Sequence, residues 1–405
     1  MTKLANIYKP ILIWSIALIL AFFAASQSLA IVMQRANPAL ASGFWPANGM
    51  AHQAIAEALL AREVQESGSQ IPESIKAKTV GHARQAFLSE PAVPEALSIV
   101  AMSLDAAEQA RMMDEVEKLS RRNQILIGWK IIDSGKREDL DGVLKYYDIS
   151  LRGNAAARDA LLPTMAASLQ NDDLVEPFRK LLAQQPPWSE YFWIWVARSP
   201  QSLENAANLR MGLVGEDIPK RVFRDEWLVE QLAVTEKFEK ASALRSVLKP
   251  LPKNGGVYVR NADFDEQSYF PPLDWELVSN GDYGAGLNGQ YGTLDLSAVG
   301  GSNGRFARQL VELPAEKLQL QVTMTDAPPA SAVITLSLSC ADRENASLAF
   351  RLNRAKLSAI LDLTKSDCTY YWLEIKGRTA SDSEGFDVSF DAIKIAARSK
   401  SDEEL

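Results

Sequence analysis

The residues that could do chemistry are few in this sequence and are poorly spaced for catalysis. The two histidines, His52 and His82, belong to no His-x-x-x-His or His-Glu pattern, so a zinc hydrolase has no ligand set. The sequence contains no Gly-x-Ser-x-Gly elbow and no Gly-x-x-x-x-Gly-Lys loop, and Gly300–Gly304 reads as a hairpin turn between strands. The 51 acidic residues leave a glycosidase-like carboxylate pair open. We expect a non-catalytic protein, with a polysaccharide hydrolase or lyase as the least favoured function.

The two cysteines, Cys340 and Cys368, both lie in the last third of the chain. A pair confined to one domain is typical of a single disulfide formed in an oxidising compartment. The alternative is two unrelated buried thiols. Because the N-terminus independently indicates export, we predict that the pair is bonded.

Composition excludes one class of partner. The chain has 405 residues, a hydrophobic fraction of 47% and a net charge of −8, with no basic run that could neutralise phosphates. We therefore expect no nucleic-acid partner, and a length sufficient for two or three domains.

The N-terminal segment predicts a membrane anchor. Ile11–Met33 is uncharged and long enough to cross a bilayer. Lys3 and Lys9 precede this span, and Arg35 is the only charged residue between the span and Glu57. This bias places the N-terminus in the cytoplasm and the rest outside, as a single-pass protein of a bacterial inner membrane with its bulk in the periplasm.

A cleaved signal peptide is the alternative to this anchor. Ser28-Leu29-Ala30 could be a cleavage site, but the apolar run resumes after it. Either interpretation exports the same domains. With an anchor, residues 1–10 are cytoplasmic, 11–33 span the membrane and 34–50 form a linker.

Residues 51–249 read as a helical repeat domain. Similar helix ends recur at intervals of 31 or 32 residues, each interval holding two helices, at Leu88, Leu119, Leu151, Leu182 and Leu213. One such unit cannot bury its apolar face alone, so the period predicts an α-solenoid of stacked helix pairs.

The helical domain resembles degenerate tetratricopeptide repeats. Ala83, Ala86 and Pro91 match the Ala-x-x-Ala…Pro pattern of that motif's second helix, although the family's period is about 34 residues. Lys145–Arg152 and Pro186–Trp188 also resemble repeat proteins of bacterial exopolysaccharide loci. The resemblance implies that the repeats bind envelope proteins.

One aromatic cluster in the helical domain could be a docking patch or a packing face. Trp188, Phe192 and Trp195 share one helix side at i, i+4 and i+7, which favours packing. Tyr146-Tyr147-Asp148 is likewise interpreted as interhelical packing.

A linker at 250–256 separates the helices from a domain of strands at 257–398, and 399–405 is predicted to be a disordered tail. Alternating apolar residues predict about nine strands and a two-sheet β-sandwich, a jelly roll. The predicted strands are 257–260, 275–278, 292–296, 306–313, 318–325, 333–339, 347–352, 370–376 and 388–395.

Three motifs in this domain resemble carbohydrate-binding modules with a galactose-binding-like fold. They are Val259-Arg-Asn-Ala-Asp-Phe-Asp-Glu266 followed by Pro272-Leu-Asp-Trp275, Arg308-Gln-Leu-Val-Glu-Leu-Pro314, and Phe390-Asp-Ala-Ile-Lys-Ile395. The resemblance implies a glycan ligand held by exposed aromatic rings, and it places Trp275 in the core.

The glycan-contact candidates are aromatic. Tyr283 and Tyr291 lie in the Gly-rich segment Gly281–Gly292, predicted to be a loop. Tyr371 is a further candidate, because alternation sends it to the sheet face opposite Tyr370 and Trp372. Phe306 and Tyr370 are the remaining aromatic candidates.

The resemblance also implies a structural calcium ion. Asp263, Asp265 and Asp391 occupy the opening and closing strands, which lie close together in such modules, and calcium binds clustered oxygens. A solvated or capping role for these carboxylates is the alternative.

The sequence favours two non-catalytic functions. The favoured one is a membrane-anchored scaffold with a glycan-binding head, acting in exopolysaccharide or capsule assembly and export. The alternative is a protein-binding envelope adaptor whose sandwich docks a partner protein.

Overall fold

The computed structural model of the protein describes residues 2–68, 75–219, 222–250, 256–343 and 348–397, with side chains from Ile11 onward. Residues up to Arg158 form one compact unit, and residues from Asp159 form a second. The predicted tail 399–405, nearly all of the predicted linker 250–256 and the side chains of segment 1–10 lie outside the described residues.

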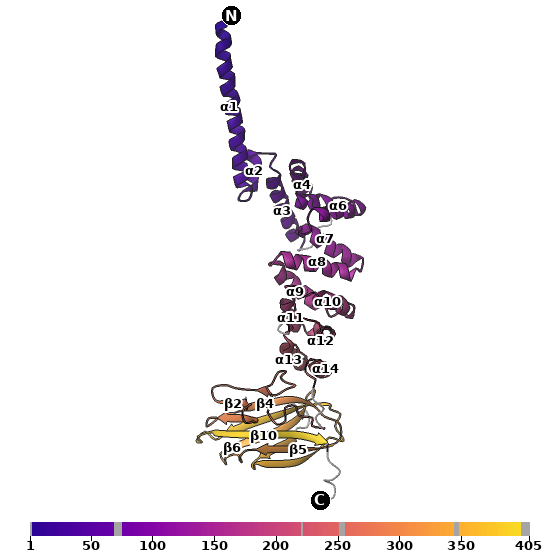
Figure 1. Cartoon of the computed structure of the whole chain (residues 1–405), viewed down its shortest axis with the longest axis vertical. Coiled ribbons are helices and arrows are strands. Elements are labelled where there is room, and N and C mark those ends of the chain that lie inside the picture. The colour runs from indigo at the N-terminus through magenta and orange to yellow at the C-terminus, as the bar shows by residue number, and fades with distance from the viewer. Residues whose placement is uncertain (1, 69–74, 220–221, 251–255, 344–347, 398–405) are drawn as a thin grey trace. The chain divides into compact units, whose positions relative to one another are not determined.

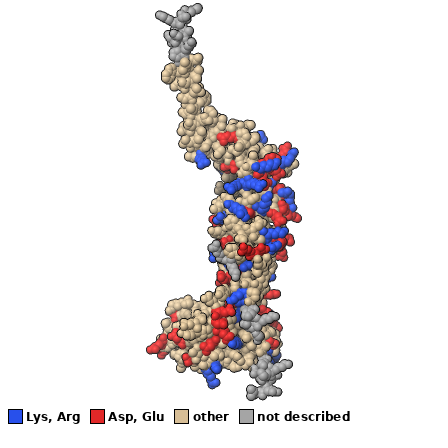
Figure 2. Space-filling model, viewed as in Figure 1, with Lys and Arg blue, Asp and Glu red and all other residues tan. Residues whose placement is uncertain are grey.

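The first helix, α1, covers Thr2–Met33 and contains the uncharged span Ile11–Met33 with the predicted bounds (Figure 1). Large side chains along this span, such as Trp14 and Val32, are exposed, and no charged side chain interrupts it (Figure 2). By length and composition, this helix could cross a membrane or serve as a signal sequence. The predicted N-terminal apolar helix is therefore confirmed.

The segment predicted to be a linker, 34–50, instead holds helix α2, Pro38–Phe44, and the start of helix α3, Gly49–Glu66. Asn37 caps α2 by accepting a hydrogen bond from the Leu40 backbone, and Pro38 supplies a preset first turn. The helix has only seven residues, which is too short to show a periodic pattern in the sequence.

The helical region consists of paired helices in both units. The first unit continues with α4 Ala77–Ser89, α5 Pro94–Ala101, α6 Ala106–Leu119, α7 Gln124–Lys136 and α8 Leu140–Gly153. The second begins with α9 Ala157–Ser168, which starts at the boundary, and has α10 Val175–Leu182, α11 Ser189–Ala197, α12 Leu203–Gly212, α13 Asp225–Val234 and α14 Phe238–Leu248. Alternate helices are neighbours, with α5 contacting α3 and α7 in one unit, and α12 contacting α10 and α14 in the other.

The period of the helix ends is confirmed. Helices α4, α6, α8, α10 and α12 all end within two residues of the five leucines that defined the repeat. The leucines differ in environment, because Leu88 and Leu119 are exposed whereas Leu151, Leu182 and Leu213 are buried. The repeat therefore predicts the positions of the helix ends better than it predicts which residues are buried in the core.

The aromatic cluster of α11 is a packing face, as predicted. Trp188 and Phe192 are fully buried, and the Phe192 ring stacks on Phe178 of α10 with centroids 5.1 Å apart. Trp195 is only half-buried and lies beneath the guanidinium of Arg198. In the first unit, Tyr146 is buried and donates its hydroxyl hydrogen to Glu117, which also fits the packing interpretation.

The C-terminal domain is a sandwich of two five-stranded antiparallel sheets. One sheet has the order β1-β4-β9-β6-β7 and the other β2-β3-β10-β5-β8, so consecutive strands often change sheet, as in a jelly roll. The strands are β1 Glu276–Leu277, β2 Tyr283–Asn288, β3 Thr293–Ala298, β4 Asn303–Glu312, β5 Lys317–Met324, β6 Ala332–Cys340, β7 Leu348–Leu352, β8 Lys356–Asp362, β9 Tyr370–Thr379 and β10 Phe386–Ala397. We name the two sheets the β4 sheet and the β10 sheet.

Three strand predictions need correction. Residues 257–260 form only an isolated bridge, because Asn261 and Phe264 adopt positive φ and turn the chain. Strand β2 occupies the segment predicted to be a Gly-rich loop, and β8 was missed. Both lie at a sheet edge, where one neighbour suffices to hold a strand of weak propensity.

The sandwich core lies between the two sheets and includes Trp275, which is 1% exposed, as predicted. Its ring packs on Phe264, and its indole nitrogen donates to the carbonyl oxygen of Asn261. Cys340 and Cys368 form a disulfide with sulfur atoms 1.99 Å apart, which confirms the predicted pairing. The bond joins the end of β6 to the segment that enters β9.

Candidate functional site

Tyr283, predicted to be a mobile ligand contact, starts the edge strand β2 and is half-buried. Its ring lies 4.8 Å from that of Phe306, and a Cβ added at Gly304 would come within 2.1 Å of the Tyr283 hydroxyl. Glycine at position 304 therefore makes room for this ring. The Tyr283 ring thus packs on Phe306, while Tyr283 also lines a hollow on the sandwich surface, and its contact with a sugar stays a prediction.

Tyr291 is the most exposed of the aromatic candidates, with 71% of its surface accessible. It lies in the turn that joins β2 to β3, where its backbone N–H donates to Asn288 and Gly292 adopts a φ of +63°. A ring that is accessible on a short, hydrogen-bonded turn can stack on a flat ligand at little cost in entropy.

The prediction for Tyr371 does not fit the structure, because the side chain is only 4% exposed. Alternation sends it inward, and its hydroxyl donates to the carbonyl oxygen of Cys368. Phe306 is fully buried as well. Tyr370, on the outer face, packs on Phe238 of α14 with ring centroids 5.5 Å apart.

The three aspartates of the predicted calcium site do not converge. Asp263 forms an ion pair of 2.6 Å with Lys394, and Asp391 accepts a hydrogen bond from Thr325. Within the described residues, the one cluster with metal-ligand geometry is Cys340, Asp342 and Cys368, whose sulfur atoms are engaged in the disulfide. Asp263 and Asp391 thus have separate partners, and the calcium site stays a prediction that rests on strand proximity.

The outer face of the β10 sheet carries a hollow of about 560 Å³. Two rungs of residues cross three strands there: Gly286–Asp295–Ser389 and Gly284–Ser297–Asp387. In each rung, glycine on the edge strand β2 lies beside polar side chains of β3 and β10. A Cβ at Gly286 would meet no atom within 4 Å, so the missing side chain leaves open space.

Asp295 lies at the centre of this hollow and is ionised. Burial acts to raise the pKa of its carboxyl group, but hydrogen bonds from Ser389, Thr293 and Asn288 outweigh it and lower the pKa below the ordinary value. The Thr293 hydroxyl donates over 2.8 Å and the Asn288 amide over 3.1 Å. These bonds hold the carboxylate in a fixed position, while Ser297 and Asp387 beside it are exposed.

The outer face of the β4 sheet neutralises its own charges. Arg305 and Arg308 both pair with Glu276, and Arg305 also pairs with Glu374, which in turn pairs with Lys376. The next aromatic residues on this face, Tyr370 and Trp372, contact Phe238 at the start of α14. This face is therefore occupied by contacts within the chain.

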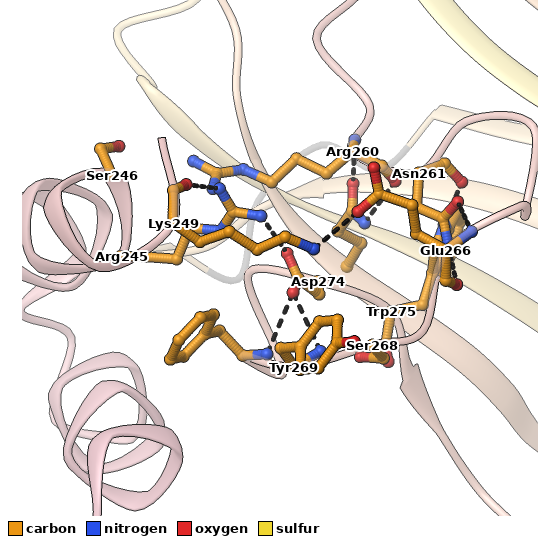
Figure 3. A network of polar contacts seen from close by, with 12 residues as sticks. Arg245, Ser246, Lys249, Arg260, Asn261, Glu266, Ser268, Tyr269, Asp274 and Trp275 are labelled. Atoms are coloured by element: carbon orange, nitrogen blue, oxygen red, sulfur yellow. Dashed lines mark hydrogen bonds and ion pairs between the residues drawn. The ribbon is translucent and has the colours of Figure 1, made fainter. Parts of the chain in front are cut away.

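A buried ion pair joins α14 to the sandwich (Figure 3). Arg245 donates to Asp274 over 3.0 Å, and the two side chains are 3% and 6% exposed. Asp274 also accepts the backbone N–H groups of Tyr269 and Phe270. The guanidinium of Arg245 further donates to the Lys249 carbonyl oxygen, which closes the end of α14.

Arg260 borders the same junction and lines a cleft of about 970 Å³. Burial, followed by the nearby cation Arg245, lowers the pKa of Arg260 to about 10, so the side chain is still a cation at neutral pH. One of its terminal nitrogens is buried and has no hydrogen-bond partner among the residues that the structure describes. An exposed pair, Lys249–Glu266, lies at the mouth of the junction (Figure 3).

The two histidines, which the sequence left apart, meet in the structure. His52 of α3 and His82 of α4 have Nδ1 atoms 2.9 Å apart. Because His52 Nε2 bonds to the carbonyl oxygen of Pro46, that nitrogen must donate, so His52 Nδ1 accepts from His82 in the neutral pair. Burial, and then the charge of His52, lowers the pKa of His82. The spacing of 30 residues, close to the repeat, was the signal that could have revealed this contact.

Comparisons with known proteins do not assign the chain to a family. No protein-family description matches the sequence, and no curated protein does. Among solved structures, a family 61 carbohydrate-binding module in complex with β-1,4-galactotriose is 12% identical, with 35% of this chain and 99% of that one covered and a TM-score of 0.26. A family 4 carbohydrate-binding module is 12% identical over 35% and 99%, with a TM-score of 0.24.

An arabinose-bound GH51 α-L-arabinofuranosidase is 15% identical over 35% of this chain and 26% of its own length, with a TM-score of 0.25. These likenesses are distant and assign no ligand. The tetratricopeptide resemblance of the helical region has no counterpart among them.

Proposed function

We propose that the protein is a non-catalytic scaffold, tethered to a membrane on its extracytoplasmic side, whose β-sandwich binds a glycan on the outer face of the β10 sheet. The apolar helix α1 and the disulfide Cys340–Cys368 indicate an extracytoplasmic location. We assign the tether to a bacterial inner membrane, with the folded units in the periplasm and a role in assembly or export of exopolysaccharide or capsule.

The hollow on the β10 sheet carries the glycan proposal. A sugar offers hydroxyl groups on a flat ring, and the hollow offers open space at Gly286 beside a fixed carboxylate. Asp295, Ser297, Asp387 and Ser389 can each accept or donate a hydrogen bond to a hydroxyl group. Hydrogen bonds to a charged group contribute about 1.5–3 kcal/mol each, so the carboxylates are the strongest polar contacts that the hollow offers to a ligand.

Non-catalytic function is supported by the carboxyl groups. Among the described residues, the carboxyl groups with clearly shifted pKa values are Glu66, Glu176, Asp295 and Asp362, and each is shifted downward. A general acid for glycoside cleavage needs a raised carboxyl pKa. The lowered pKa of Asp295 in the hollow suits this carboxylate to binding sugar hydroxyls rather than to donating a proton.

Binding of the host's surface polysaccharide by the full chain in nanodiscs tests the proposal, with calorimetry as the readout. Gly286→Val fills the hollow and Asp387→Ala removes an exposed acceptor, so we expect each to weaken binding at least tenfold. Gly289→Val is the matched control, since it adds the same side chain in the same hairpin where nothing lies within 4 Å and outside the hollow. Tyr291→Ala tests whether the exposed ring contributes.

A specific observation favours a second candidate, a protein-binding adaptor. The aromatic residues Tyr370 and Trp372 of the β4 sheet face contact Phe238 of α14, so α14 is joined to the sandwich by ring contacts as well as by the buried ion pair. Natively folded protein that binds no polysaccharide at millimolar sugar would rule out the glycan-binding head and favour this adaptor.

A further inference from the structure

Helix α2 folds back along the apolar helix α1. The Trp45 ring, which directly follows α2, contacts the Phe23 ring edge-on with centroids 6.0 Å apart. Ala30 of α1, Ala41 of α2 and Ala51 of α3 are fully buried against one another. Small residues at this contact let the three helices approach closely.

The depth of this contact follows from helix geometry. A hydrocarbon core of about 30 Å is crossed by about 20 helical residues, so a span that starts at Ile11 leaves the core near Ala30. Phe23 precedes Ala30 by seven residues, which is about 10 Å along the helix axis. A ring in contact with Phe23 must therefore lie well inside the outer leaflet.

The segment around α2 is chemically suited to that depth. Between Arg35 and Glu57 the sequence has no Asp, Glu, Lys or Arg. Several of its backbone groups find partners within the chain: the N–H of Asn37 donates to Met33, and that of Trp45 donates to Ala41. Backbone groups that are satisfied internally are the condition for entering lipid.

The outward side of α2 exposes apolar side chains. Leu40 is 49% exposed and Phe44 is 43% exposed, on a helix whose other side packs on α1. Exposed apolar residues on an uncharged helix that is continuous with a membrane span match the lipid around that span.

We infer that α2 is embedded in the outer leaflet beside α1, with Leu40 and Phe44 in contact with lipid and Trp45 directed toward the bilayer interior. The inference rests on the proposed membrane tether. In this arrangement the membrane holds α1 and α2 together as a hairpin. The buried Ala30 is then part of a folded contact and not the end of a removed leader.

Site-directed spin labelling tests this, because the native cysteines are joined to each other and an added cysteine is the single free thiol. Leu40→Cys and Phe44→Cys are labelled in the full chain reconstituted into phosphatidylcholine vesicles. Leu18→Cys, in the middle of α1, reports the tether, and Leu88→Cys, 74% exposed on α4, is the control for a water-facing leucine. Collision rates with oxygen, which concentrates in lipid, are compared with those of a water-soluble nickel complex.

We expect labels at positions 40, 44 and 18 to collide at least five times more often with oxygen than with nickel, and the label at position 88 to show the reverse. Nickel-accessible labels at 40 and 44 with an oxygen-accessible label at 18 would overturn the inference and leave the tether intact. A nickel-accessible label at 18 would overturn both. Labels at 40 and 44 that neither reagent reaches would mean that protein, not lipid, covers α2, which also overturns it.

Discussion

Replacing Arg245 by methionine should destabilise the junction between α14 and the sandwich far more than an ordinary ion-pair mutation. The substitution keeps the apolar stem but leaves the Asp274 carboxylate buried with only two backbone N–H donors. Removing one member of a buried pair costs about 3–5 kcal/mol, because the remaining charge has lost its partner and cannot be hydrated. In a unit of this size, that corresponds to a fall in Tm of roughly 6–20 °C.

The Lys249–Glu266 pair supplies a matched control. It joins the same two elements at 2.6 Å, but its side chains are 34% and 52% exposed. Solvent-exposed pairs contribute about 0–1 kcal/mol, so Lys249→Met should lower the Tm by less than about 4 °C. The assay is thermal unfolding of the full chain in detergent, followed by far-ultraviolet circular dichroism for the helices and tryptophan fluorescence.

A further variant separates charge from geometry. Arg245→Lys keeps the cation but loses the planar fork that serves Asp274 and the Lys249 carbonyl oxygen together, so we expect a loss between those of the other two variants. Equal Tm values for Arg245→Met and Lys249→Met would refute the reasoning, since the buried pair would then be no more important than the exposed one.

Three other predictions concern the disulfide, Gly304 and His82. Cys340→Ala with Cys368→Ala should lower the free energy of unfolding by about 3–4 kcal/mol in urea titrations, from the entropy of a closed loop with a sequence separation of 28 residues. Gly304→Ala should cost about 1–3 kcal/mol by displacing the Tyr283 ring, whereas Gly286→Ala, which meets no neighbour, should cost nothing measurable in the same titration. The pKa of His82 is lowered in the folded state, so its contribution to stability is present above the ordinary pKa of 6.5 and is lost as pH falls through the folded value. We therefore expect the melting temperature to fall more steeply between pH 7 and pH 5 in the native protein than in His82→Gln.

The architecture could be predicted from sequence because its signals are local. The uncharged run Ile11–Met33 and the leucine period needed no knowledge of tertiary contacts, and both are found in the structure. Strand β2 was missed because Gly284 and Gly286 have low strand propensity, and pairing with β3, together with the bridge from Ser279 to Gly284, holds them extended. The same glycines form the hollow, so the feature that hid the strand also makes the candidate site.

The sites were harder to predict, because they depend on which side of a strand faces the core and on contacts between distant elements. Tyr371 was correctly separated from Tyr370 and Trp372 by alternation, but alternation alone cannot say which face is buried. The Arg245–Asp274 pair joins a helix to a loop that follows a segment of no regular pattern, and no spacing rule relates the two residues. The residues that position the sandwich were therefore invisible in the sequence.

The two outer faces of the sandwich differ in a way that bears on function. A ligand on the β4 sheet would have to displace Glu276 and Glu374 from arginine partners already within 2.7–3.5 Å, or displace α14 from Tyr370. On the β10 sheet, the hydrogen bonds of Asp295 come from neighbouring neutral groups, and the exposed Ser297 and Asp387 face open space. Binding there exchanges water for ligand without breaking contacts within the protein. The competition for partners therefore favours the β10 sheet over the β4 sheet as the face for the proposed polar ligand.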